Sequence, residues 1–178
     1  MGTALTDAEL LLLGLVAEMP RHGYELDQII ETRGMREWTQ IGFSSIYFVL
    51  GKLEKAGLVG AEVPTGAKAR KAFCITASGR EVLCEQTIAA LAAYRPTFSS
   101  LLLGMVHWPV LSRDVALNAL ETRLSSVVAE LERLERVRRQ RQPTPDHVES
   151  LFDFSAGQLN AERSWINTTL DYMRSKPW

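Results

Sequence analysis

The apolar residues of the first 60 positions recur every three or four residues, in three short runs. The first run opens with Thr6 and Glu9, which have the spacing of a capping box. The second run extends from His22 to Gly34, and the third covers residues 44–57. This periodicity predicts three short helices that follow one another closely.

The third of these helices has two unlike faces. At about 100° per residue, its apolar positions fall on one side, at Ile46, Val49, Leu50 and Leu53. The opposite side carries Ser44, Phe48, Gly51 and Lys55. We expect Ser44 or Ser45 to cap the start of the helix and Gly57 to end it. One face is predicted to pack on a core, and the other is left to meet a partner.

Beyond this helix the pattern changes its period. Residues 58–63 and 72–75 are typical of two strands joined by a turn at 64–66. The connection holds the densest cationic group in this half of the chain, Lys68, Arg70 and Lys71. A fourth helix is predicted from about Arg80 to Tyr94. Three helices followed by a basic hairpin indicate a winged helix-turn-helix with a two-stranded wing.

The second half of the chain is predicted to be helical throughout. Arg95 and Pro96 break the fourth helix, so we expect a domain of residues 1–94 and another of 95–178. An apolar segment covers 98–110, and two long amphipathic helices follow, over 112–140 and from the prolines at 143 and 145 to about 175. They are predicted to pair antiparallel.

The apolar positions of the two long helices follow the seam of a coiled coil. They are Leu117, Leu120, Leu124, Val127, Leu131, Leu134, Phe152, Leu159, Ile166 and Met173. Two helices bury little surface by themselves, so these residues are predicted to form the dimerisation surface of a twofold homodimer.

Composition narrows the class of protein. The chain has 178 residues, 46% of them hydrophobic, and a net charge of -1, so any nucleic-acid binding must come from a local patch. Cys74 and Cys84 form no disulfide framework or metal motif, and no phosphate loop or nucleophile pattern occurs. We expect no enzyme, cofactor or metal. No apolar run is long enough to cross a membrane, and we expect a cytoplasmic protein.

Four stretches together carry a family resemblance. HGYEL at 22–26, SIY at 45–47, KLEKAGLV at 52–59 and the tail at 66–79 resemble the N-terminal pattern of PadR family transcriptional regulators. The helical remainder is similar in length and layout to the longer, two-domain branch of that family. The resemblance implies a winged-helix DNA-binding domain, a C-terminal dimerisation domain, and repression relieved by a small molecule. Phe48 departs from the proline that many members have, and Gly51 stands where a charged residue is common.

A transcriptional regulator of this kind, acting as a homodimer, is expected to bind double-stranded DNA at a palindromic operator through the outer face of the third helix and the wing. The predicted DNA-binding residues are Ser44, Ser45, Tyr47, Phe48, Lys52, Lys55, Lys68, Arg70 and Lys71. Phe48 is expected either to touch a thymine methyl group or to contact another protein helix or simply be exposed. Tyr47 is expected either to reach the DNA or to be half-buried with its hydroxyl outward.

The sequence also contains candidate residues for an effector site. Aromatic residues that could line an apolar cavity for a small planar aromatic ligand are Tyr94, Phe98, Trp108 and Trp165. Aromatic residues at helical spacing, however, more often pack in a core. Two further interpretations remain open from the sequence. One is a winged helix that mediates protein–protein interaction without operator binding, and the other is a repressor that has no effector.

Overall fold

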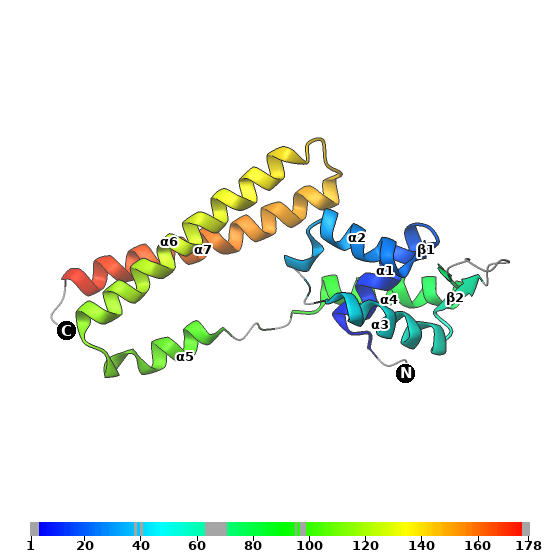
Figure 1. Ribbon diagram of the computed structural model, residues 1–178. Helices are drawn as coiled ribbons and strands as arrows, with labels where there is room; N and C mark the ends of the chain where they lie inside the picture. The colour runs from blue at the N-terminus through cyan, green and yellow to red at the C-terminus, as the bar shows by residue number, and fades with distance from the viewer. Residues whose placement is uncertain are drawn as a thin grey trace. The chain divides into compact units, whose positions relative to one another are not determined.

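The computed structural model describes residues 4–37, 39, 41–62, 71–94, 96 and 99–175 (Figure 1). The chain divides into two compact units, residues 1–96 and 97–178. In the described part, no helix is long and apolar enough to span a bilayer. The architecture is mainly α, with a winged-helix N-terminal unit followed by helices, and this confirms the predicted fold class.

The first unit has five helical segments and a small sheet. Its helices are α1 (Asp7–Glu18), α2 (Gly23–Thr32), the short 3-10 segment η1 (Met35–Glu37), α3 (Phe43–Lys55) and α4 (Ala77–Ala92). The strands are β1 (Arg21–His22), β2 (Val59–Glu62) and β3 (Ala72–Ile75), which pair antiparallel in the order β1-β3-β2. The central strand β3 pairs Ile75 with Val59 and Phe73 with Arg21.

The strand β1 was not predicted. Instead of a two-stranded hairpin, the sheet has three strands, because Arg21 and His22 are extended before α2 begins and pair with β3. A strand of two residues is too short to show the alternation by which strands are recognised in a sequence.

Local signals explain where most helices of this unit begin. At α1 the Glu9 amide donates to Thr6 Oγ1 over 3.3 Å and the Thr6 amide donates to the Glu9 carboxylate over 2.8 Å, which confirms the capping box. At α4 the Thr76 hydroxyl accepts from the Gly79 amide over 3.0 Å, so this helix begins three residues earlier than predicted.

The expectation for the start of α3 was wrong. Gly42 occupies the capping position with no side-chain bond, because the chain is already helical at Phe43. Ser44 and Ser45 therefore lie in the first turn rather than before it. Gly57, at φ 75°, follows the end of α3 as predicted, in a left-handed conformation that suits glycine.

The first unit is organised around one apolar core. Helix α3 packs against α1, α2 and β2, and α1 also packs against α4 and β3. The core is made of Leu12, Leu13, Leu15, Val16, Leu26, Ile30, Ile41, Ile46, Val49, Leu50, Leu53, Leu58, Val59 and Phe73. Among the described residues, Glu9 is the charged side chain buried beside it.

The second unit is a helical hairpin with a short helix before it. Helix α5 (Ser100–His107) and the 3-10 turn η2 (Trp108–Val110) precede α6 (Arg113–Gln140) and α7 (Asp146–Ser175). The two long helices lie side by side over most of their length, drawn yellow-green and orange to red in Figure 1. Their shared core contains Ala116, Leu120, Val127, Leu131, Ile166, Leu170 and Met173.

Candidate nucleic-acid interface

The inner and outer faces of α3 differ as the periodicity predicted. Ile46, Val49, Leu50 and Leu53 are buried. Ser44, Ser45 and Lys55 are exposed, and the Phe48 side chain is 69% exposed. Because the apolar side is fixed to α1, α2 and β2, the polar and aromatic side of α3 is held outward.

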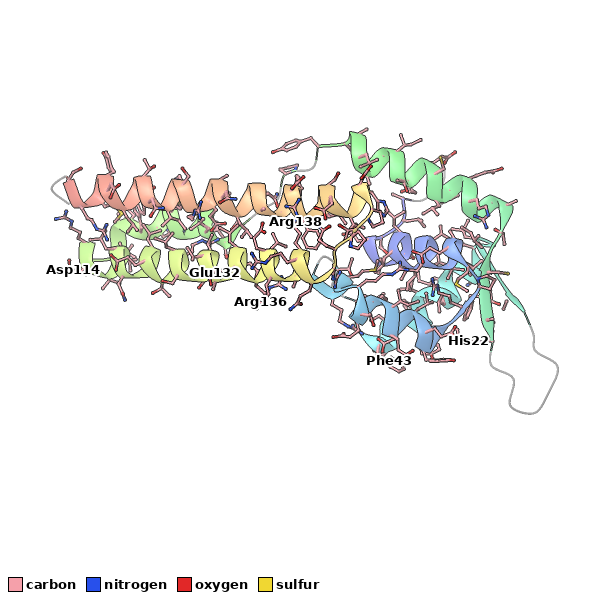
Figure 2. The ribbon with its side chains drawn as sticks, turned by 90° about the horizontal axis from the view of Figure 1, so that it is seen from above. His22, Phe43, Asp114, Glu132, Arg136 and Arg138 are labelled. Carbon is pink, nitrogen blue, oxygen red and sulfur yellow. The ribbon has the colours of Figure 1, made fainter. Side chains whose placement is uncertain are left out.

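Tyr47 is fixed in position by its neighbours. Its ring lies so close to the start of α2 that a Cβ built on Gly23 would be 2.5 Å from a ring atom. On its other side the ring meets Phe43 edge to face, with 5.6 Å between centroids. Tyr47 is still 48% exposed, so it is an anchored side chain on the outer face rather than a core residue. Phe43, which the sequence prediction omitted, is labelled at the start of α3 in Figure 2.

Lys52 is bound to the first helix. Its Nζ lies 2.7 Å from Glu9 Oε1 and 5.9 Å from the centre of the Phe48 ring. The hydrogen bond from Lys52, followed by the one from the Thr6 amide, holds the pKa of the Glu9 carboxyl below its ordinary value. The ammonium group predicted to face phosphate is therefore already engaged by α1, although half of the side chain remains exposed.

Lys71 joins the wing to α3. Its Nζ lies 2.6 Å from Glu54 Oε2 and 5.1 Å from the centre of the Phe73 ring, so β3 and the last turn of α3 are tied together. The other two predicted wing cations, Lys68 and Arg70, lie outside the described residues. In the described part of the chain no carboxylate lies within ion-pair distance of Lys55. Lys55 is thus the α3 cation that remains available for a partner.

This geometry brings together most of the predicted interface. Ser44, Ser45, Tyr47, Phe48, Lys52 and Lys55 share one helix, and Lys71 is ion-paired to it. Sequence reasoning missed Phe43, Gly23 and the two glutamates that hold the lysines. The capping-box role of Glu9 was visible in the sequence, but its second role depends on the packing of α1 against α3.

The predicted effector residues are divided between the two units of the chain. Tyr94 is 90% exposed in the first unit, and Phe98 lies outside the described residues. Trp108 and Trp165 are half-buried and pack on the α6–α7 core. They do what aromatic residues at helical spacing do most often, which is to fill helix contacts.

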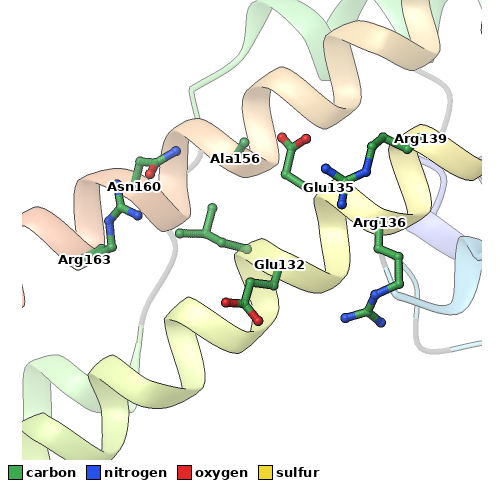
Figure 3. Close-up of a pocket in the computed structure, with 8 residues that line it drawn as sticks. Glu132, Glu135, Arg136, Arg139, Ala156, Asn160 and Arg163 are labelled. Carbon is green, nitrogen blue, oxygen red and sulfur yellow. The ribbon is translucent and has the colours of Figure 1, made fainter.

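A groove of about 500 Å³ lies instead along one flank of the α6–α7 hairpin (Figure 3). Its lining is Leu131, Glu132, Glu135, Arg136, Arg139, Ala156, Asn160 and Arg163. Both signs of charge are present, and in the described residues none of the four charged side chains from α6 forms an ion pair. The groove is open and most of its lining side chains are charged, which does not favour a planar apolar ligand.

The ten residues predicted for dimerisation lie along the seam between α6 and α7. Leu120, Val127, Leu131, Leu134, Phe152, Ile166 and Met173 are buried within one chain, and Leu117, Leu124 and Leu159 are half-buried. In a single chain all of them except Leu134 and Phe152 belong to the core of the hairpin.

Comparison with known protein families gives a match within the first unit of the chain. Residues 12–85 match the model described as "Transcriptional regulator PadR-like family". A stretch of 79 residues is 39% identical to an uncharacterized 37.1 kDa protein in a transposon of Streptomyces fradiae. That stretch covers 43% of this chain and only 21% of the relative.

Solved structures share the fold over nearly the whole chain. Bacillus subtilis PadR in complex with operator DNA has a TM-score of 0.75 at 21% identity, covering 94% of this chain and 99% of that one. The same protein in complex with p-coumaric acid has a TM-score of 0.76 at 20% identity, covering 93% and 98% of the two chains. At these identities the likeness establishes the arrangement of helices and strands.

Proposed function

This chain belongs to the PadR-like family of transcriptional regulators, and from that premise we propose that it binds operator DNA as a homodimeric repressor. The members of this family are transcriptional regulators and not enzymes. The observation that carries it is the outer face of α3: exposed, held from behind by the core, and joined by an ion pair to the cationic base of the wing. The likeness to a structure solved with operator DNA supports it.

In this proposal α3 enters the major groove. The hydroxyls of Ser44 and Ser45 lie in the first turn, where the free backbone amides and the helix dipole favour phosphate. Lys55 reaches the DNA backbone from the last turn. Lys71, with Lys68 and Arg70 from the wing, meets phosphates or the adjacent minor groove.

The homodimer proposal is supported by surface that a single chain leaves open. The exposed apolar side chains of the second unit include Leu102, Leu103 and Val106 on α5, Val110 and Val115, and Leu151, Phe154 and Tyr172 on α7. A second copy would remove such surface from water. Two α3 helices of a dimer would then lie about 34 Å apart, one turn of duplex DNA.

The charges along α6 also suit a second copy. Glu132 and Glu135 are followed on the same flank by Arg136 and Arg139, all lining the groove in Figure 3. If two α6 helices cross antiparallel about a twofold axis between 135 and 136, each glutamate faces an arginine of the partner. A string of charges that complements itself in this way favours an antiparallel pair of identical helices.

The proposal also includes release of the repressor by a small aromatic ligand. It rests on the fold shared with a structure containing p-coumaric acid. Thermal melts against a panel of phenolic acids test it, because a ligand that binds the folded chain raises its Tm. A protein with no effector shows no shift with any of them.

A matched pair of glycine substitutions tests the DNA-binding proposal. A Cβ on Gly51, on the outer face of α3, meets nothing within 4 Å, and the same holds for Gly157 in α7. Gly51→Glu should weaken binding to the DNA upstream of the chain's own gene by more than about tenfold, because the carboxylate faces phosphate. Gly157→Glu should leave binding unchanged. Equal affinity of the two variants contradicts an α3 interface and favours the alternative of a protein-interaction module.

A further inference from the structure

Helix α3 lacks the side chains that most often form hydrogen bonds with bases in the major groove. Its sequence, FSSIYFVLGKLEK, contains no Arg, Asn, Gln or Asp. Arginine bidentate to guanine and asparagine or glutamine bidentate to adenine are the common direct contacts in the major groove. None of them can be made from this helix.

The charged side chains that α3 does carry are not well placed to read bases. Lys52 is bound to Glu9 at 2.7 Å, and Glu54 is bound to Lys71 at 2.6 Å. Lys55 lies in the last turn, whereas recognition helices contact base edges mainly through their N-terminal residues. What remains toward the N-terminus of the outer face is two serine hydroxyls and three aromatic rings.

Those rings form an apolar strip. Phe43 is 54% exposed and meets Tyr47 edge to face, and Phe48 is the most exposed of the three at 69%. Tyr47 is held against Gly23, which fixes the middle of the strip. The ammonium of Lys52 lies near the Phe48 ring and steadies its position.

We propose that this aromatic strip, centred on Phe48, reads the C5-methyl groups of thymine and makes the operator half-site T-rich. The thymine methyl is the apolar group that base pairs present in the major groove, so an apolar strip can discriminate there without hydrogen bonds. Ser44 and Ser45, whose hydroxyls bind phosphate or neighbouring base edges, add little selectivity. The inference rests on the proposed function and names the chemistry of its recognition.

Selection of bound sites from a random duplex library, at one stated salt concentration, supplies the DNA for the test. Each thymine of the selected half-site is then replaced by 2′-deoxyuridine, which removes the methyl group and keeps every hydrogen-bonding atom. For the unaltered protein, uridine at one or more positions should raise Kd about fourfold per methyl lost, from the burial of one carbon.

Two alanine variants assign the effect to a residue. Phe48→Ala should bind the thymine site more weakly and should lose its sensitivity to uridine at one position. Ile88→Ala, in α4, removes an apolar side chain that is 61% exposed and therefore similar in exposure, and it should keep the full sensitivity. Circular dichroism of both variants shows whether each keeps its helices, which exposed positions should allow.

The outcomes separate the inference from the function. Selected sites that are G-rich, or that bind uridine and thymine equally, overturn methyl reading while leaving operator binding intact. Uridine sensitivity that Phe48→Ala preserves at every position overturns the role of this strip. A library from which no duplex is enriched contradicts the proposed function itself, and the inference with it.

Discussion

The ion pair between Glu9 and Lys52 should give a measurable coupling between α1 and α3. The Glu9 carboxylate is buried and accepts from the Thr6 amide at 2.8 Å, from the Thr6 hydroxyl at 2.9 Å and from Lys52 at 2.7 Å. The perturbations are Glu9→Gln, Lys52→Met and the double variant. The measured quantity is the free energy of unfolding of the full chain.

The expected magnitude lies between two limits. A hydrogen bond to a charged group contributes about 1.5–3 kcal/mol, and an exposed ion pair about 0.2–1 kcal/mol. Glu9 is buried but half of Lys52 is exposed to solvent. We therefore expect a coupling of about 1 kcal/mol, which corresponds to roughly 2–4 °C in Tm for a chain of this size.

The assay is urea denaturation of the three variants and the unaltered chain, followed by circular dichroism. The same cycle on Glu54 and Lys71, whose side chains are 36% and 47% exposed, is the matched control and should give a smaller coupling. If the effects of Glu9→Gln and Lys52→Met add to within about 0.3 kcal/mol, the pair does not link the two helices.

The same pair predicts a dependence on pH. The pKa of Glu9 is lower in the folded chain, chiefly through the Lys52 hydrogen bond, so its ionised form stabilises the fold. This stabilisation is complete above the unfolded pKa of about 4.3 and is lost as the pH falls through the lower folded value. The stability difference between the unaltered chain and Glu9→Gln should therefore shrink at acid pH.

Three further changes test other parts of the structure. Gly79→Ala should destabilise the chain by more than about 2 kcal/mol, because its Cβ would lie 2.0 Å from the Leu58 carbonyl oxygen; an unchanged urea midpoint contradicts this packing. Glu135→Arg should weaken self-association in sedimentation equilibrium, and the added change Arg136→Glu should restore it, since the swapped string again complements itself; equal weakening by both argues against the antiparallel register. Lys55→Met should reduce the slope of log K against log salt for operator binding by about 1, with a smaller change for the other α3 lysine.

Much of the first unit could be predicted because its signals are local. The strand at residues 72–75 and the capping box at Thr6 agree with the structure residue by residue. Each depends on positions only a few residues apart. The predicted start of α3 was wrong because either serine could cap a helix. Only the backbone conformation at Gly42 decides which residue takes the capping position.

The candidate site could be predicted only in part. Periodicity indicated which face of α3 is outward. It carried no information about the ion-pair partners of Lys52 and Glu54 on that helix. Glu9 comes from another helix and Lys71 directly precedes β3, so both contacts depend on the tertiary fold. The heptad seam of α6 and α7 shows a similar limit: the spacing predicts apolar helix packing, and the packing is met within one chain at Val127 and Ile166.

The contacts of α3 act together on its outer face. Glu9 holds the helix from α1, Gly23 receives the ring of Tyr47 from α2, and Glu54 connects the last turn to the base of the wing. These anchors lie on three different elements, so a shift of α3 along or about its axis would break at least one of them. A surface that discriminates methyl groups must be fixed to within a fraction of an ångström, because contact energy falls steeply with small gaps. The anchoring found in the free chain is therefore a requirement of apolar base reading, and loosening an anchor should cost selectivity between thymine and uridine before it costs overall affinity.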